Sequence, residues 1–521
     1  MRDRGLPAPE IATPRGLRLE RFEVAVLGAF AATSLWVLAL NLWQVVVHGR
    51  VWTGTDGVFV IDQLQYLAWI RDASHHFLVS NLFVLRPTPS DFFQPAIALS
   101  GGLTALGIPA WLSLLLWKPV AVGGVFLGIR QYVLRIFPSR MSARAALVLA
   151  IFFGSFTVVY GALGTIGDLF LGFLSWGYVF SLLSLACMLA TLLAYDRLRS
   201  ASAVGWLPGA LGALASLLHP WHGELLIVTI VAAEVLAYRR GGGRRGLLLL
   251  AVTVAMTTAP LVYYELLGRL DQSWALARVA SKHSFPLLWI LLALAPLLVP
   301  ALIAFARRPR GFLEASARAW LLAALIVYAV SASSVQATPL HAFQGITIPL
   351  AVLAVQAFER VGWSRVPHHR LAATALVALV TVPATVNQLL TARRLVVPLP
   401  GRASFVTRDE RRALDYLASD PTPGGVMTRS YLGALVPGET GRQTYVGDCL
   451  WSEPGCSQRL VTVRGLFTGT LSPGEARRVV TGSRARFLLA DCRGTTDLRH
   501  LLGPLVTFER SFGCARIYGV R

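Results

Sequence analysis

The side chains best suited to chemistry in this chain lie in the connectors between long apolar runs, and they gather in every second connector. These connectors hold acids, histidines and a lysine, namely Asp56, Asp62, Asp168, His219, His222, Glu265, Asp271, Lys282, His283 and His341. The connectors between them are rich in arginine instead. Ionisable groups at membrane depth are costly and mark functional sites. Their one-sided distribution predicts a reaction or binding site on a single face of a membrane.

Asp62 is the strongest candidate for a general base. It lies on a predicted helix among apolar neighbours, and such surroundings raise the pKa of a carboxyl group towards neutrality. A carboxylate with a near-neutral pKa suits proton abstraction. The alternatives for Asp62 are an N-terminal helix cap or a solvated acid at the membrane surface. Asp56 is followed by Gly57 and fits a turn, so it is a weaker candidate for the base.

Asp168 is the second carboxylate that could take part in catalysis. It closes the string Thr165–Asp168 at the end of an apolar run on the same side. Its place after Gly167 fits an ordinary turn as well as a functional role. Near the first acid, it could bind a divalent cation or a sugar hydroxyl. The sequence therefore leaves the metal and any cofactor undetermined.

The string His219-Pro220-Trp221-His222 links two apolar runs at the same face. Proline enforces a sharp reversal of the chain there. Two histidines at membrane depth favour a contact with substrate, although a hydrogen bond to the backbone is the alternative. His341 borders two later runs and either contacts a sugar or caps a helix end.

Cations are scarce on this side, and those present are candidates for binding an anionic headgroup. Arg269, Arg278, Lys282 and His283 share one connector. Binding of an anionic substrate would explain why cations occur on this side. The alternative explanation is contact with the phosphates of membrane lipids in general. No glycine-rich phosphate cradle is present, because Gly241–Gly243 has neither the spacing nor a preceding strand.

The elements that must position these residues are membrane spans. The hydrophobic share of 55% and the charged share of 14% are too apolar for a soluble protein of 521 residues. The sequence predicts a polytopic α-helical membrane protein with about eleven transmembrane helices. We expect them near 22–47, 108–136, 144–161, 174–195, 204–218, 222–238, 246–267, 286–306, 319–336, 343–358 and 371–391.

The arginines set the expected orientation of these spans. Twenty of them lie in one set of connectors, at 1–21, 137–144, 196–199, 239–245, 307–318 and 360–370. The opposite connectors before the last span hold six cations, Arg50, Arg71, Arg86, Arg269, Arg278 and Lys282. The positive-inside rule then predicts a multi-pass cell-membrane protein with a cytoplasmic N-terminus. Topology and anionic lipid account for the net charge of +21, so we expect no nucleic-acid partner.

Two regions on the predicted outer side are more than loops. Residues 48–107 form a long outer segment in which Val58–His76 has apolar residues at helical spacing, as in an amphipathic helix at the membrane interface. Residues 392–521 are predicted to form a small extracytoplasmic α/β domain, which leaves 1–391 as the transmembrane domain. The helices predicted for the α/β domain are Asp409–Ala418 and Pro473–Val480. Its predicted strands are Gly425–Thr428, Thr444–Val446, Phe487–Ala490, Leu505–Phe508 and Ala515–Tyr518.

Four of the five cysteines fall in that outer region, and an even number on an oxidising side predicts two disulfides. Cys449 and Cys456 would close a short loop through Pro454-Gly455. Cys492 and Cys514 would join two strand ends.

Three stretches resemble the GT-C superfamily of polytopic glycosyltransferases. They are DQLQYLAWIRDAS with Asp62 and Tyr66, the HPWH turn at His219–His222, and HAFQGITIPLAVLA at His341–Ala354. The resemblance implies a polyprenyl-phosphate sugar donor, inverting transfer on the extracytoplasmic face, and an acidic base in the first outer loop, which falls on Asp62. Many members have an adjacent acidic pair there, whereas this chain has Ile61-Asp62-Gln63.

Glycosyl transfer to a glycan, lipid or protein acceptor of the cell envelope is therefore the first functional hypothesis. Asp56, Tyr66, His219, His222, Arg269, Lys282 and His341 are the expected substrate contacts. The rivals are a transporter or flippase of lipid-linked glycans and a non-catalytic assembly protein. Transporters usually show paired halves and charged residues near mid-span, and neither feature is evident in this sequence.

Overall fold

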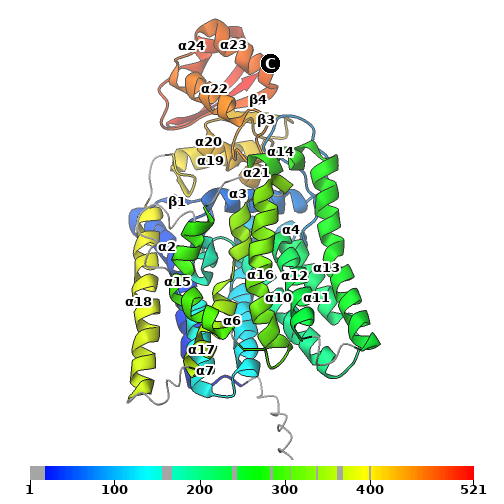
Figure 1. The fold of residues 1–521 in the computed structure, drawn as a ribbon. Coiled ribbons are helices and arrows are strands. Elements are labelled where there is room, and N and C mark those ends of the chain that lie inside the picture. The colour runs from blue at the N-terminus through cyan, green and yellow to red at the C-terminus, as the bar shows by residue number, and fades with distance from the viewer. Residues whose placement is uncertain are drawn as a thin grey trace, which may run out of the picture.

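The computed structural model describes residues 18–154, 167–237, 243–281, 286–305, 307–335, 338–360, 368–397 and 401–521. A bundle of long helices carries a smaller group of helices and strands at one end, which we call the capped end (Figure 1). The chain enters the bundle through α1 (Arg21–Ser34) and α2 (Trp36–His48). These helices meet at an angle of 47°.

The remaining bundle helices follow in two groups. The first group is α5 (Ala110–Leu115), α6 (Trp117–Ile136), α7 (Arg140–Phe152), α9 (Leu171–Leu174), α10 (Val179–Ser200), α11 (Leu207–Leu218) and α12 (Pro220–Ala237). The second group is α13 (Arg244–Leu270), α14 (Gln272–Ala280), α15 (Leu287–Ala304), α16 (Phe312–Val330), α17 (Thr347–Arg360) and α18 (His369–Leu395). Short helical turns lie at Gly167–Leu169 (η1), Ser331–Val335 (η3) and Pro339–Phe343 (η4).

Among the described residues, eight helices are long and apolar enough to cross a membrane, or nine if the bent α1–α2 pair counts as one span. The expected count of eleven also included α7 and α11. Helix α11 has twelve residues, so it is about 18 Å long. That is shorter than the roughly 30 Å hydrocarbon layer. The expected span 144–161 runs past α7 into residues outside the described part.

Packing within the bundle centres on α17. The segment that contains it is 94% buried, whereas the α18 segment is only 17% buried and exposes its apolar side chains. Helix α17 packs against α15 and α7, and α12 packs against α16. A buried core inside and bare apolar helices outside are what a lipid environment requires of a membrane bundle.

Helix α3 (Val60–Ala73) crosses the capped end between the bundle and the C-terminal elements (Figure 1). The sequence predicted this helix, but protein covers much of its polar side. Gln63, Gln65 and Asp72 are buried, and α4 (Pro95–Ala105) and α21 (Val436–Thr440) pack against it. The expected contact of this helix with a membrane surface stays a prediction.

The C-terminal elements contain a four-stranded sheet of order β3-β4-β6-β5. Strands β3 (Gly425–Thr428) and β4 (Ala485–Ala490) are parallel, whereas β4 with β6 (Ala515–Val520) and β6 with β5 (Val506–Phe512) are antiparallel. Its helices are α19 (Arg408–Ser419), α20 (Ser430–Gly433), α21, α22 (Cys456–Thr468), α23 (Pro473–Ser483) and α24 (Leu498–Leu502), followed by the turn η6 (Gly503–Leu505).

The alternation of side chains along β4 lets helices pack on both faces of the sheet. Alternate residues of β4 face opposite cores: Phe487 and Leu489 pack with α19, and Leu488 packs with α22 and α23. Thr407 caps α19 through a capping box with Glu410. Four of the five predicted strands are present, but Thr444–Val446 is wrong as a strand, because Thr444 forms only an isolated bridge to Val426.

Both predicted disulfides are confirmed. Cys449 bonds to Cys456 and Cys492 bonds to Cys514, with Cα–Cα distances of 5.3 and 4.7 Å. Among the described residues, Cys187 is the free cysteine.

Candidate functional site

Asp62 lies in the first turn of α3, half-buried at the capped end of the bundle. Burial, together with the nearby negative charge of Asp448, raises the pKa of its carboxyl group to about 7. The hydroxyl group of Tyr178, at the start of α10, donates a hydrogen bond to the Asp62 carboxylate and opposes that rise. A carboxyl group with this pKa exchanges its proton near neutral pH, as a general base must.

Tyr66 follows Asp62 by one helical turn and is half-buried. Burial, together with the charge of Asp62, raises the pKa of its phenol. Its ring contacts Phe180 and Trp69, with centroid distances of 4.9 and 6.2 Å. Tyr66 therefore remains protonated and can donate a hydrogen bond beside the candidate base.

The three predicted histidines come together from two separate segments. His219 precedes α12 and His222 lies in its first turn, whereas His341 lies in η4. The ring of His219 lies 4.4 Å from that of His222 and 5.1 Å from that of His341. The ring of Tyr178 is 6.1 Å from His341. Tyr178 therefore joins this histidine cluster to Asp62.

Asp56 is held differently from Asp62. It is buried and forms an ion pair with Lys118, which also donates a hydrogen bond to the Ser34 carbonyl at 2.8 Å. The Asp56 backbone N–H donates to Gln63 Oε1 at 2.7 Å. Burial raises the pKa of Asp56, and the ammonium of Lys118 opposes the rise. A carboxylate engaged by a buried cation is a poorer proton acceptor than Asp62.

Of the remaining predicted residues, Arg269 has an ion-pair partner outside the group around Asp62. Arg269 is exposed and pairs with Glu265 at 2.7 Å, one turn away on α13. Glu265 also pairs with Arg278 at 3.1 Å. Lys282 lies outside the described residues, and so does the side chain of Asp168.

Three contributors to the site were missed by the sequence analysis: Lys118, Tyr178 and Asp448. Lys118 is one of two lysines in the chain and lies inside the predicted span 108–136, where an ionisable residue is itself a signal of function. Tyr178 and Asp448 gave no such signal, because each reaches Asp62 only through the folding of distant segments. Asp448 is buried, and its pKa is raised to about 6 by burial.

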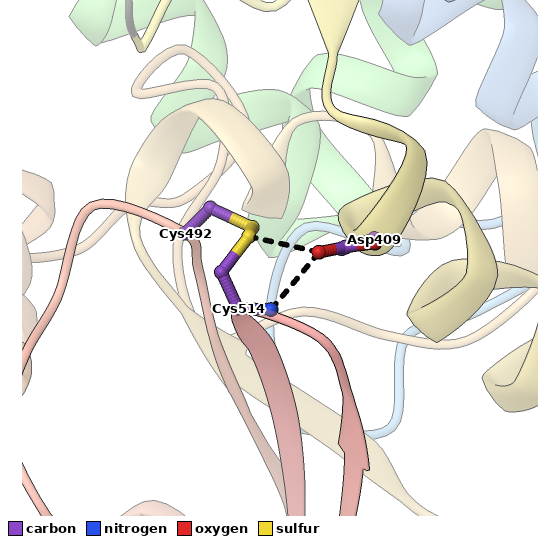
Figure 2. A group of neighbouring side chains, drawn as sticks. All are labelled: Asp409, Cys492 and Cys514. Atoms are coloured by element: carbon purple, nitrogen blue, oxygen red, sulfur yellow. Dashed lines mark hydrogen bonds between the residues drawn. A yellow bond between two sulfur atoms is a disulfide. The ribbon is translucent and has the colours of Figure 1, made fainter.

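A triad of possible metal ligands, Asp409, Cys492 and Cys514, is the one such group among the described residues. Figure 2 shows that both sulfurs are joined in a disulfide and that Asp409 accepts a hydrogen bond from the Cys514 backbone at 2.9 Å. Thiolates rather than disulfides bind metals. The hydrogen bond from Cys514 to Asp409 instead attaches α19 to the residue that precedes β6.

No known family model matches this chain, and no curated protein matches it by sequence. Solved structures do match. The oligosaccharyltransferase of Archaeoglobus fulgidus in its apo form aligns with a TM-score of 0.55 and 15% identity, over 96% of this chain and 74% of that one. ArnT from Cupriavidus metallidurans in the apo state aligns with a TM-score of 0.51 and 14% identity, over 95% of this chain and 97% of that one.

The arabinofuranosyltransferase AftD from Mycobacteria aligns with a TM-score of 0.54 and 15% identity, over 97% of this chain and 42% of that one. Two further matches contain lipid phosphates: the Archaeoglobus fulgidus enzyme AglB with an inhibitory peptide and a dolichol-phosphate (TM-score 0.51), and ArnT with undecaprenyl phosphate (TM-score 0.50). At identities of 13–15%, these likenesses concern the fold. Over nearly its whole length, this chain has the fold of the GT-C glycosyltransferases.

Proposed function

We propose that this protein is an integral-membrane glycosyltransferase that takes a sugar from a polyprenyl-phosphate-linked donor. The observation that carries the proposal is Asp62, a half-buried carboxyl group with a pKa of about 7 at the capped end of a GT-C fold. The lipid phosphates bound by the Archaeoglobus fulgidus enzyme and by ArnT support the class of donor.

In the proposed reaction, the carboxylate of Asp62 removes the proton from an acceptor hydroxyl group. The acceptor oxygen then bonds to the anomeric carbon, and the bond from that carbon to the phosphate oxygen breaks. Polyprenyl phosphate leaves with the electron pair. A single displacement of this kind inverts the anomeric configuration. Tyr178 orients Asp62 through a hydrogen bond, and the protonated Tyr66 lies one helical turn from Asp62 on α3.

The remaining predicted contacts have supporting roles in this proposal. The histidine cluster of His219, His222 and His341 borders the bound substrate on the side of Tyr178. Asp56 with Lys118 fixes the segment that leads into α3. Asp168, Arg269 and Lys282 stay as proposed contacts to the acceptor or to the lipid phosphate, on the extracytoplasmic face that the arginine distribution predicts.

The test is transfer by the purified protein in liposomes. A panel of radiolabelled polyprenyl-phosphate sugars is supplied together with cell-envelope acceptors, and loss of label from the donor is measured. We expect one donor to lose its label in a protein-dependent way. Label that crosses the bilayer while still attached to the intact donor would indicate a flippase and contradict the proposal.

A further inference from the structure

Helices α1, α6 and α7 pack against one another and enclose a pocket with a strongly charged lining. We call it the arginine pocket, and its charged lining residues are Glu20, Glu23, Arg130, Arg140 and Arg144. Helix α7 begins at the end of the bundle opposite the capped end (Figure 1). The pocket therefore lies at the arginine-rich end, which the sequence predicts to be cytoplasmic.

Arg130 is the buried cation of the arginine pocket. It lies within the candidate membrane span Ala110–Ile136 and is only 3% exposed. Its Nε pairs with Glu23 Oε1 at 2.8 Å, and its Nη2 donates to the Arg18 carbonyl at 3.2 Å. Its Nη1 is also buried and has no hydrogen-bond partner among the described residues. Because an unpaired buried donor costs free energy, this nitrogen indicates that a further acceptor belongs in the pocket.

Two further arginines form the rim of the pocket. Arg140 and Arg144 lie one turn apart on α7, and their side chains are 64% and 43% exposed. Both pair with the carboxylate of Glu20, at 3.4 and 2.8 Å. Each guanidinium carries five N–H donors, more than one shared carboxylate can engage. Since exposed ion pairs are also weak, a second oxyanion can bind beside Glu20 or displace it.

The charge of the pocket and its surroundings favour the phosphate of a lipid as the ligand. Three arginines and two glutamates line the pocket, so its net charge is +1. The planar fork of arginine matches the geometry of a phosphate group. Each of the three helices also exposes an apolar side chain, namely Val24, Leu127 and Met141. Exposed apolar side chains suit contact with acyl chains, so a headgroup between the arginines and tails along the helices are compatible.

We propose that the arginine pocket binds the phosphate group of an anionic membrane lipid, with Arg130 on its inner side and Arg140 and Arg144 at its rim. This site is separate from the one around Asp62, and the inference does not depend on sugar transfer. A bound phosphate joins residues of α6 and α7 beside the start of α1. Because the ligand binds the folded protein, it stabilises the packing of these three helices.

Native mass spectrometry of the full-length protein measures this binding directly. The protein is freed of lipid in a nonionic detergent and titrated with phosphatidylglycerol or with phosphatidylcholine. Detergent removes the surface potential of a bilayer, so a preference for the anionic lipid reports a specific site. We expect phosphatidylglycerol to bind more tightly than phosphatidylcholine. Inorganic phosphate is the competitor, and displacement of the lipid by an equal concentration of it would assign the pocket to free phosphate and overturn the proposal.

Arg140→Gln combined with Arg144→Gln removes the two cations at the rim. We expect this double variant to bind phosphatidylglycerol about thirtyfold more weakly, at about fivefold for each arginine. Arg307→Gln combined with Arg308→Gln is the matched control, because both arginines are exposed and neither lines the pocket. We expect the control to bind like the unaltered protein. Equal weakening in the two double variants would show general attraction to charge and refute a specific site.

Glu20→Gln decides the question if the double variant of Arg140 and Arg144 does not fold. The substitution keeps an oxygen that can accept the hydrogen bond from Arg144 Nη2 and removes the negative charge that competes with phosphate. We expect phosphatidylglycerol to bind about fivefold more tightly, a gain that misfolding cannot produce. Unchanged or weaker binding in Glu20→Gln would contradict the proposal. None of these measurements involves sugar transfer, so failure of the catalytic proposal is recognised separately, by unimpaired transfer in Asp62→Asn.

Discussion

At the scale of single residues, the environment of each acid decides its chemistry. Asp62 and Asp56 are six residues apart in the sequence and both are candidate bases. Asp56 is paired with Lys118, whereas Asp62 has a tyrosine hydroxyl and another acid as neighbours. The sequence could rank the two acids as candidate bases, because Asp62 lies among apolar residues of a predicted helix and Asp56 precedes a glycine in a predicted turn. It could not reveal Tyr178, Lys118 or Asp448 as their partners, because those contacts join distant segments.

The pKa of Asp62 predicts how the rate depends on pH. Only the ionised carboxylate accepts a proton, and burial raises the pKa of Asp62 to about 7. We therefore expect kcat/KM to rise with pH up to about 7 and to level off above that pH, where Asp62 is fully ionised. The measurement is a pH series with the donor that the liposome panel identifies. A rate that stays constant down to about pH 5, near the ordinary pKa of a carboxyl group, would show that Asp62 is not the base.

The Asp56–Lys118 ion pair predicts a loss of stability when only one partner is removed. Both residues are buried, so Lys118→Met leaves an uncompensated carboxylate. The expected cost is about 3–5 kcal/mol, measured by unfolding in detergent. Combining it with Asp56→Asn removes the stranded charge and should recover much of the stability. A Lys118→Met protein as stable as the unaltered one would contradict a structural role for the pair.

At the scale of elements, the sequence predicted helices and strands better than it predicted what covers them. Helix α3 and four strands were identified from their periodicity, and both disulfides from cysteine placement. The burial of α3 beneath α21 could not be predicted, because the polar residues of α3 are equally compatible with a helix face exposed to water. Helix α22 was missed because it carries several polar residues and is little amphipathic. Eleven spans were expected, more than the eight or nine counted among the described residues, for two reasons. Helix α11, expected as a span over 204–218, has only twelve residues, and the expected span 144–161 runs partly outside the described residues.

Trp451 tests the docking of the C-terminal elements on α3. Trp451→Ala removes ring contacts to Trp69 and Trp274 and leaves a cavity. We expect a loss of about 3–5 kcal/mol in stability, as for other buried aromatic residues, and faster proteolysis within residues 401–521. Trp206→Ala is the control, because Trp206 is 68% exposed. Equal proteolysis of the two variants would argue against docking through this tryptophan.

At the scale of the whole molecule, the long apolar helices and the fold agree with a multi-pass membrane protein, and the orientation of the bundle is a prediction from arginine placement. The candidate base and the C-terminal elements share the capped end (Figure 1). If that end is extracytoplasmic, the donor must be a lipid-linked sugar that reaches the outer leaflet, since soluble nucleotide sugars are confined to the cytoplasm.

Cysteine labelling tests this orientation. In a Cys187→Ser background, Gly474→Cys and Gly243→Cys place thiols at positions where an added Cβ meets nothing within 4 Å. With intact cells and a membrane-impermeant maleimide, we expect Gly474→Cys to react and Gly243→Cys to be protected. The reverse pattern would place the capped end in the cytoplasm and exclude the proposed donor route.

Sugar transfer by Asp62→Asn is the most direct test of the central claim. The substitution keeps the shape of the side chain and removes the proton acceptor, so turnover in liposomes should fall about a hundredfold to ten-thousandfold while donor binding largely survives. Asp56→Asn, measured beside it, should retain far more activity. Near-normal turnover in Asp62→Asn, with or without loss of activity in Asp56→Asn, would contradict the account.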